Sequence, residues 1–226
     1  MLKKITAVGD SSIICDFGEN VDLTTNSKVI KLFYYVKNLA QEKKIRGLLN
    51  YTPSYNKLLI NFDLEKVKSS EIIEKINSVD LTILPEIIKS KNHIIPICYD
   101  EEFALDLKLM EKKLNLNFSE IIKIHTETSF FVYMIGFIPG HPYMGDTDKK
   151  LHLSRIPTPR LRVPKGSVGL AEKFCNIYTF EAPGGWNIVG KTPLNFFDIK
   201  KNNPSILLPG DTVKFESLKK SEIKNI

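Results

Sequence analysis

The chain has 226 residues, of which 42% are hydrophobic and 26% are charged, a composition with enough apolar residues for one hydrophobic core or two modest ones. No stretch approaches the roughly 18 uninterrupted apolar residues of a membrane span, and the first residues lack the apolar core of a signal peptide. We therefore expect no membrane partner and a cytoplasmic location. Cys15, Cys98 and Cys175 lie far apart and no His or Cys pairs show metal-ligand spacing, so we expect neither a disulfide framework nor a metal site.

The formal net charge of +6 is concentrated in one region. Between Lys149 and Lys173 seven basic residues face the single acid Glu172, a surplus equal to that of the whole chain. Lys outnumbers Arg 28 to 4, yet three of the four arginines fall between Arg155 and Arg162. Because a guanidinium binds a carboxylate or a phosphate with two parallel hydrogen bonds, this cluster favours an anion site. A solvated basic loop is the alternative, and charge alone leaves both open.

The first 90 residues alternate between strand and helix patterns. The expected elements are a hairpin of 3–8 and 12–16, a helix over 27–44 that ends on Lys43 and Lys44, a hairpin of 45–51 and 58–62, and a helix over 70–79. This ββαββα order predicts a small α+β domain over residues 1–90.

Residues 91–226 show a different texture. A strand over 93–99 precedes Asp100, which we expect to cap a helix that runs to about Leu114, and Asn117 and Glu120 stand at capping-box spacing for a second helix. After a strand over 130–135, residues 136–193 hold 15 of the 24 Gly and Pro residues, which predicts short strands joined by shaped loops, as in a β-barrel or sandwich.

Three segments of this second region could form a ligand site. The loop 136–145 combines three glycines and two prolines, so it is either a rigid wall that faces a ligand or a plug at the end of a barrel. In the segment 157–168, alternation places Arg160 and Arg162 on one face of an edge strand, as an anion clamp would require. Trp186 follows two glycines and is either a stacking wall or, more often for a lone Trp, part of the core.

Several ordered blocks together resemble the KipI / allophanate hydrolase subunit 1 family, and within it the branch formed by the B subunit of 5-oxoprolinase. The blocks are Ile95-Pro96-Ile97-Cys98-Tyr99-Asp100, the loop 136–145, Thr158-Pro159-Arg160 through Val168, Ala182-Pro183-Gly184-Gly185-Trp186 and Gly190-Lys191-Thr192-Pro193. The resemblance implies that the α+β domain of residues 1–90 is followed by a cyclophilin-like β-barrel over residues 91–226.

The resemblance also implies a function. Such proteins belong to an ATP-dependent 5-oxoprolinase, a hydrolase that opens 5-oxoproline to L-glutamate. They work together with a KipA-like C subunit and with the A subunit of 5-oxoprolinase, and we expect this chain to be inactive without them. ATP with Mg²⁺ is the expected cofactor, and the sequence leaves open whether it contacts this chain or a partner at their interface. The alternative is a regulatory protein that binds and inhibits a sensor histidine kinase. A nucleic-acid partner is disfavoured, because the basic region lacks interleaved aromatic residues.

We expect His125, Arg160 and Arg162 to be catalytic, with the arginines holding negative charge and His125 or His141 moving a proton. Further residues are expected to bind the substrate or an anion, namely Arg155, Lys165, Gly136, Phe137, Pro139, Gly140, His141, Tyr143, Ser167, Glu181 and Trp186. The sequence departs from the family pattern at Ala104 and Leu105, at His141, and at Phe174, Cys175 and Asn176, where the family has a Gln-Thr-Gly-like turn. These departures leave the identity of the substrate open.

Overall fold

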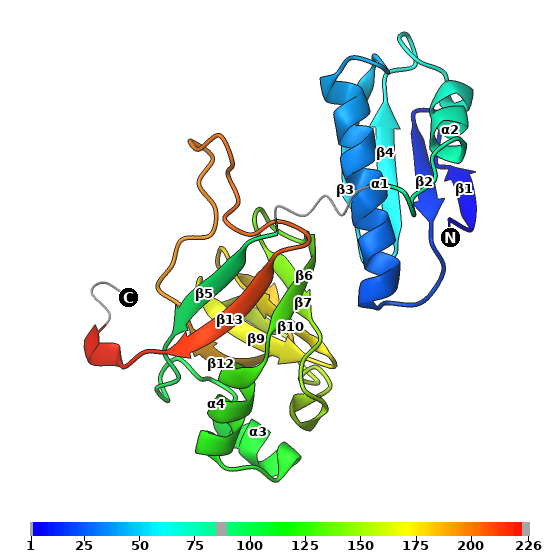
Figure 1. Cartoon of the computed structure of the whole chain (residues 1–226). Helices are drawn as coiled ribbons and strands as arrows, with labels where there is room; N and C mark the ends of the chain where they lie inside the picture. The colour runs from blue at the N-terminus through cyan, green and yellow to red at the C-terminus, as the bar shows by residue number, and fades with distance from the viewer. Residues whose placement is uncertain (1, 85–89, 223–226) are drawn as a thin grey trace. The chain divides into compact units, whose positions relative to one another are not determined.

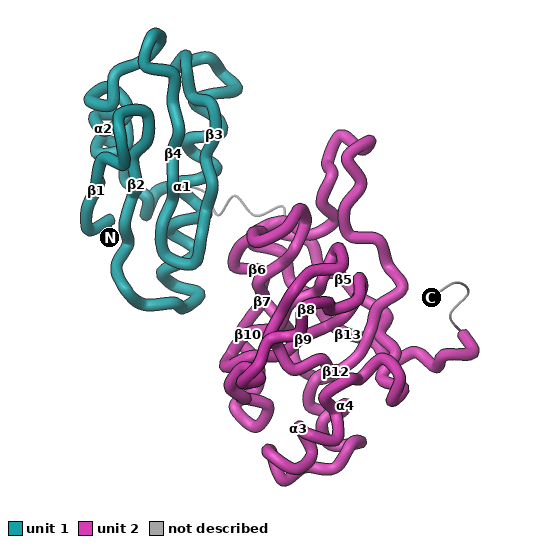
Figure 2. Tube along the Cα trace, turned by 180° about the vertical axis from the view of Figure 1, so that it is seen from behind, with its two compact units in different colours: residues 1–89 teal, residues 90–226 magenta. Residues whose placement is uncertain are grey.

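The computed structural model describes residues 2–84 and 90–222, and the chain divides into two compact units, residues 1–89 and 90–226 (Figure 2). The sequence patterns placed the division after residue 90. Each unit has a hydrophobic cluster of its own, so each can be treated as a separate domain.

The first unit is an antiparallel sheet with two helices on one face (Figure 1). Its elements are β1 (Lys4–Ala7), β2 (Ser12–Asp16), α1 (Leu23–Gln41), β3 (Leu48–Pro53), β4 (Lys57–Phe62) and α2 (Ser69–Asn77). The strand order is β1-β2-β4-β3, which makes β1 an edge strand. Alternate residues of the central strands, such as Ile13 and Ile60, pack with Leu32 of α1 and Ile72 of α2 in one buried cluster. Both helices therefore cover the same face of the sheet.

Helix α1 begins and ends earlier than the sequence pattern predicted. Asp22 caps its N-terminus by accepting a hydrogen bond of 2.7 Å from the Thr25 N–H. The helix ends at Gln41, so the expectation that Lys43 and Lys44 complete its last turn is wrong. Lys43 takes a left-handed backbone with φ 56°, and the chain turns there so that Ile45 becomes buried in the core.

The second unit is a strongly curved, barrel-like sheet of seven strands with a separate pair of strands beside it. Its elements are β5 (Asn92–Ile97), α3 (Leu107–Leu114), α4 (Phe118–Glu127), β6 (Phe130–Ile135), β7 (Pro142–Gly145), η1 (Lys149–Leu151), β8 (Arg160–Val163), β9 (Ser167–Ala171), β10 (Phe174–Ile177), β11 (Ala182–Gly184), β12 (Asn187–Lys191), β13 (Thr212–Ser217) and η2 (Lys220–Glu222). The order in the large sheet is β12-β9-β10-β7-β6-β13-β5, in which only β13 and β5 run parallel. Strands β8 and β11 form the separate pair.

The two edges of the large sheet meet at Cys98 and Lys191. Cys98 directly follows β5 and Lys191 ends β12, and the pair exchanges two backbone hydrogen bonds of 2.8 and 2.9 Å. A Cβ atom on Gly190 would lie 2.6 Å from the Cys98 carbonyl oxygen, so the edges come this close because residue 190 has no side chain. Inside the sheet, apolar side chains from the strands and from α3 and α4 form one core. The two helices pack at one end of it (Figure 1).

The helix expected from residue 101 to 114 is shorter in the structure. Residues 101–103 form a turn after Asp100, and α3 begins only at Leu107. The cause is Asp106, whose backbone N–H donates to the Ile188 carbonyl at 3.0 Å while its carboxylate accepts from the Ile188 N–H at 2.7 Å. This attachment to β12 interrupts the helical hydrogen bonds. The capping box at Asn117 and Glu120 is confirmed, with both reciprocal hydrogen bonds present.

Candidate functional site

Strand register aligns three residues on the outer face of the barrel. Asn176 of β10 lies opposite Tyr143 of β7 on one side and opposite Gly169 of β9 on the other. Residues directly opposite in a sheet share a face, and their neighbours Cys175 and Leu170 point into the core. Tyr143, Asn176 and Gly169 therefore form a row across three strands that points away from the barrel interior.

Gly169 provides the space in this row. A Cβ atom at residue 169 would lie 2.8 Å from Asn176 Oδ1 and 2.8 Å from the Cβ of Trp186, which is closer than side-chain atoms approach. Any other residue at position 169 would displace the Asn176 amide or the indole. The glycine thus allows the amide and Trp186 to lie side by side.

Aromatic rings surround the row. The His141 ring lies 5.1 Å from the Tyr143 ring and 5.3 Å from the Tyr178 ring, and the Tyr143 ring lies 6.0 Å from Trp186, all edge to face. The guanidinium carbon of Arg155 stands 5.6 Å from the Trp186 ring, within cation–π range. The structure therefore assembles one cluster, which we call the barrel cluster, from His141, Tyr143, Arg155, Asn176, Tyr178 and Trp186.

Two members of the barrel cluster carry buried polar atoms without partners. Asn176 and His141 are each 1% exposed, and within the described residues Nδ2 and Oδ1 of Asn176 and Nδ1 of His141 lack a partner in hydrogen-bond geometry. The Asn176 side chain nevertheless lies near the Tyr178 hydroxyl, and a loose hydrogen bond between them partly offsets the burial that raises the pKa of that phenol. Each unpaired buried polar group costs about 1–3 kcal/mol, so such atoms mark a place where a polar ligand would be stabilised.

Arg155 is the charged residue of the barrel cluster, because the other titratable side chains of the cluster are neutral at pH 7. Burial lowers the pKa of His141 to about 4, so the imidazole is neutral at pH 7. Burial also raises the pKa of Tyr143 and of Tyr178, against the opposing effect of Arg155, so both phenols keep their protons. Arg155 itself is exposed and forms no ion pair within the described part of the chain. The arrangement suits a ligand with a neutral amide-like part and an anionic group.

Arg160 uses its guanidinium within the protein. Its Nη1 and Nη2 donate to the two carboxylate oxygens of Asp106 at 3.0 and 2.6 Å, and Asp106 is 4% exposed. The same carboxylate accepts from the Ile188 N–H, so Asp106 ties β8 and β12 to the start of α3. Sequence reasoning missed Asp106, although this residue lies beside Ala104 and Leu105, where the chain departs from the family pattern. The residues that pair with Asp106 lie more than 50 positions away in the sequence.

Arg162 does not join Arg160 in a clamp. Its side chain is 83% exposed and lies 3.7 Å from Glu181, which is itself exposed. Lys165 lies over the exposed ring of Phe180, at 5.8 Å from its centroid. The structure therefore places these expected anion-binding residues on the surface near β8 and β11, where they contact exposed neighbours.

The loop 136–141 shapes one side of the barrel cluster. Phe137 is 59% exposed and its ring lies 5.4 Å from His141, while the Pro139 carbonyl accepts a hydrogen bond of 2.7 Å from the Thr179 hydroxyl. Gly140 has φ 74° and would place a Cβ 3.0 Å from Phe197. Ser167 is buried, and its carbonyl accepts from the Tyr178 N–H at 2.9 Å. Gly136 precedes this turn, and its N–H donates to the His141 carbonyl at 3.0 Å.

His125 lies in the core and not in the barrel cluster. It is fully buried, its Nδ1 is 2.7 Å from the Tyr99 hydroxyl, and its ring stacks on Phe215 at 4.6 Å. Nε2 lies 3.9 Å from the Cys175 sulfur. Burial lowers the pKa of His125 to about 3. A neutral ring enclosed in this way packs the core of the second unit.

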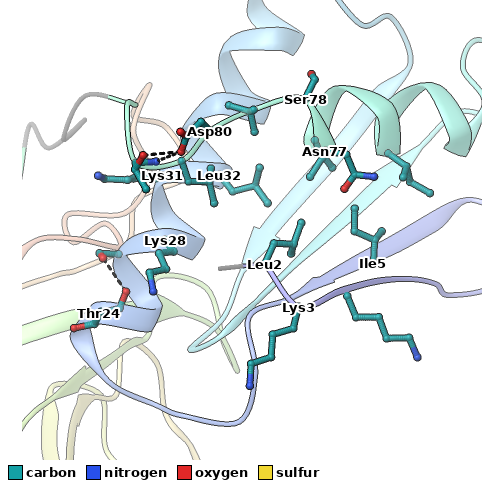
Figure 3. A pocket seen from close by; sticks show the side chains of 17 residues that line it. Leu2, Lys3, Ile5, Thr24, Lys28, Lys31, Leu32, Asn77, Ser78 and Asp80 are labelled. Carbon is teal, nitrogen blue, oxygen red and sulfur yellow. Dashed lines mark hydrogen bonds between the residues drawn. The ribbon is translucent and has the colours of Figure 1, made fainter.

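The first unit contains a groove of its own (Figure 3). It has a volume of about 1150 Å³ and lies between β1, α1, α2 and the segment that follows α2. In the residues that the structure describes, no group of three or more His, Cys, Asp or Glu side chains is placed to hold a metal ion. None of the described helices is both long and apolar enough to cross a membrane.

Comparison with known proteins gives the family. Residues 3–207 match the model described as "Carboxyltransferase domain, subdomain C and D". The chain belongs to this family. It is 33% identical to the B subunit of 5-oxoprolinase from Bacillus subtilis, over 94% of this chain and 91% of the relative. It is 30% identical to the protein of the same name from Haemophilus influenzae, over 93% and 96% of the two chains. The resemblance found in the sequence is confirmed.

A solved member of the fold extends further than this chain. The crystal structure of TTHA0988 superposes with a TM-score of 0.81 and 28% identity over 95% of this chain. This chain spans 41% of the length of TTHA0988.

Proposed function

We propose that the chain is one subunit of an ATP-dependent 5-oxoprolinase, a hydrolase that opens 5-oxoproline to L-glutamate and is inactive without its partners. The relatives named as the B subunit of 5-oxoprolinase support this, because the matches cover more than nine tenths of both chains. The partners would be the KipA-like C subunit and the A subunit of that enzyme. The observation that indicates where the substrate would bind is the buried amide of Asn176 in the barrel cluster, whose Nδ2 and Oδ1 lack a partner in close hydrogen-bond geometry.

The groups of the barrel cluster are complementary to a lactam. A five-membered lactam holds its N–H and C=O on the same side of a cis amide, so a primary amide such as Asn176 can accept from the one and donate to the other. Arg155 carries the unpaired guanidinium of the cluster and suits the carboxylate of 5-oxoproline. Tyr143 and Trp186 present ring surfaces to the remaining apolar atoms.

The chemistry explains why ATP is required. A lactam carbonyl is a poor electrophile; transfer of the γ-phosphoryl group of ATP to its oxygen, with release of ADP and loss of the ring N–H proton, would give a more reactive O-phosphorylated imidate. Water adds to the imidate carbon and the ring C–N bond breaks as the nitrogen takes a proton. This gives a γ-acyl phosphate, which a second water hydrolyses to the carboxylate and phosphate. The role proposed for this chain is to bind and orient the lactam, with the neutral His141 beside it as the group able to take or give a proton.

We place ATP at the interface with a partner. Mg²⁺ bound with a nucleotide usually takes the phosphates and one or two protein carboxylates as ligands, and we propose that the partner supplies those carboxylates. The residues of this chain would then act on the lactam.

Reconstitution tests the proposal. The chain is co-expressed with candidate partners encoded beside it, and glutamate release from 5-oxoproline is measured with and without ATP. We expect glutamate only from the full mixture with ATP. No glutamate from an assembled complex would contradict the proposal, and inhibition of histidine-kinase autophosphorylation by the isolated chain would then support the regulatory alternative.

Variants of the barrel cluster locate the site. Asn176→Leu keeps the volume but removes the amide, so we expect kcat/KM to fall about 100-fold, as expected when a buried amide partner of the substrate is lost. Its melting temperature should change little, because the removal of two poorly satisfied buried atoms offsets the loss of the contact with the Tyr178 hydroxyl. Arg155→Ala should mainly raise KM, and Arg46→Ala in the first unit is the matched control. Full activity of the Asn176→Leu variant would show that the lactam does not bind in the barrel cluster.

A further inference from the structure

The groove of the first unit has an apolar floor. Its lining includes Leu2, Ile5, Leu32, Ile73, Ile76, Val79 and Leu81, most of which pack only partly against the core. The exposed parts of these side chains lie between α1 and α2, beside the edge strand β1 (Figure 3). Exposed apolar surface of this kind is stabilised when another apolar surface covers it.

Four lysines line the same groove. Lys3 directly precedes β1 and Lys4 is its first residue. Lys28 and Lys31 lie on α1, one helical turn apart (Figure 3). None of the four forms an ion pair within residues 2–84 and 90–222, whereas other lysines of this unit, such as Lys57 and Lys66, do. The groove therefore combines an apolar floor with positive charge, of which only that of Lys3 acts on a nearby carboxylate in the described residues, where it helps to lower the pKa of Asp16.

The acidic residue in the lining does not offset this charge. Asp80 accepts hydrogen bonds from the backbone N–H and the hydroxyl of Thr82 at 2.8 and 2.7 Å. It forms no ion pair with Lys28 or Lys31 in the described structure. Asp80 is the one acidic residue among the described lining residues, and it is already engaged in a local turn.

We propose that this groove binds an acidic amphipathic helix of a partner polypeptide. An open groove of about 1150 Å³ that runs along two helices and an edge strand, with lysines beside an apolar floor, suits a segment of chain. An α-helix that places apolar side chains at i, i+3, i+4 and i+7 covers such a floor along one face. Glu or Asp residues on both sides of that face would meet Lys3 and Lys4 on one side and Lys28 and Lys31 on the other.

This inference is independent of the proposed 5-oxoprolinase function. Every lining residue belongs to the first unit, and none belongs to the barrel cluster of the second. The groove can therefore be tested with the full chain alone, without substrate or the other components of the enzyme.

The probe is a fluorescent synthetic peptide of about 18 residues with Leu at i, i+3, i+4 and i+7 and Glu at flanking positions. Binding to the full chain is measured by fluorescence anisotropy. We expect saturable binding that weakens at least tenfold when salt rises from about 0.05 to about 0.5 M, because the contacts are between charges near the surface. An isomeric peptide with scrambled Leu positions and a peptide with Lys in place of Glu should bind at least tenfold more weakly.

Charge reversal locates the binding surface. Lys28→Glu with Lys31→Glu should weaken binding of the Glu peptide at least tenfold. Lys3→Glu with Lys4→Glu, which alters exposed positions at the start of the chain, should weaken it equally. Lys68→Glu with Lys75→Glu is the matched control, since it makes an equal change of net charge outside the groove. Melting curves of each variant verify folding. Equal weakening by the control pair, equal binding of the three peptides, or binding of dodecanoate with no binding of the peptide would overturn the proposal.

Discussion

The Asp106 carboxylate joins three segments that are distant in the sequence. It holds both guanidinium nitrogens of Arg160 and the N–H of Ile188 while it is almost fully buried. A buried carboxylate is tolerated only where charge and donors surround it, and here both are present. The arginine expected to hold an anionic ligand is therefore held by an internal anion, and its role is to position β8.

Asp106→Asn should destabilise the second unit by about 3 kcal/mol, because it leaves the Arg160 guanidinium partly buried without its counter-charge. Urea unfolding followed by Trp186 fluorescence measures this. The control Glu181→Gln removes the partner of the exposed Arg162 and should change stability by less than about 0.5 kcal/mol. Similar losses of stability in the two variants would show that the ion pair between Asp106 and Arg160 contributes little to the stability of the second unit.

The buried His125 gives the protein a dependence on acid. Its pKa is lowered to about 3 in the folded chain, whereas an imidazole in the unfolded chain titrates near 6.5. Between these values the unfolded state binds the additional proton, so the free energy of unfolding falls as the pH falls from about 6.5 towards 3. In the His125→Leu variant this contribution is absent. Below about pH 6 its free energy of unfolding should therefore fall with decreasing pH by about 1.4 kcal/mol less per pH unit than that of the unaltered chain.

Urea unfolding of the His125→Leu variant and the unaltered chain at several pH values between 4 and 7 checks this. His141, with a pKa lowered to about 4, adds a similar dependence that stays in both proteins. Parallel stability curves for the two proteins would mean that His125 is not held neutral by burial.

At the scale of elements, glycines decide how closely strands meet. Gly190 allows the edges β5 and β12 to meet at Cys98, and Gly169 allows Asn176 and Trp186 to share one face. Gly190→Ala should lower stability by about 1–3 kcal/mol, because a Cβ 2.6 Å from a backbone oxygen forces the strands apart. The melting temperature of the second unit measures the loss.

Gly185→Ala is the matched control for Gly190→Ala. Its Cβ would meet only ordinary contacts, the nearest at 3.5 Å to Pro159, so its melting temperature should remain within about 2 °C. A similar fall in both variants would mean that loss of glycine flexibility, and not the contact with Cys98, determines the effect.

At the scale of the whole molecule, the two units should unfold as separate transitions. Each has its own buried cluster, and the sole tryptophan, Trp186, lies in the second unit. Leu32→Ala empties space in the core of the first unit and should cost it about 2–5 kcal/mol. Far-UV circular dichroism should then show an earlier first transition while the Trp186 fluorescence transition stays in place. A shift of both transitions together would show that the units unfold cooperatively.

The sequence by itself determined what depends on neighbouring residues. The capping box of Asn117 and Glu120 was predicted and is confirmed, because both hydrogen bonds form within four residues. The family was recognised from ordered blocks of residues, and the density of Gly and Pro indicated short strands joined by shaped loops. The arginine cluster was also evident from the sequence, but which carboxylate each arginine meets was not.

Tertiary structure alone decided the barrel cluster and the placement of His125. Asn176 reaches Tyr143 and Gly169 through the register of three strands, and Asp106 meets Arg160 across 54 positions of sequence. His125 was predicted to face a ligand, yet the packing of α4 against β13 turns it into the core. Contacts between distant residues depend on how strands pair and helices pack, and no local pattern encodes those distances.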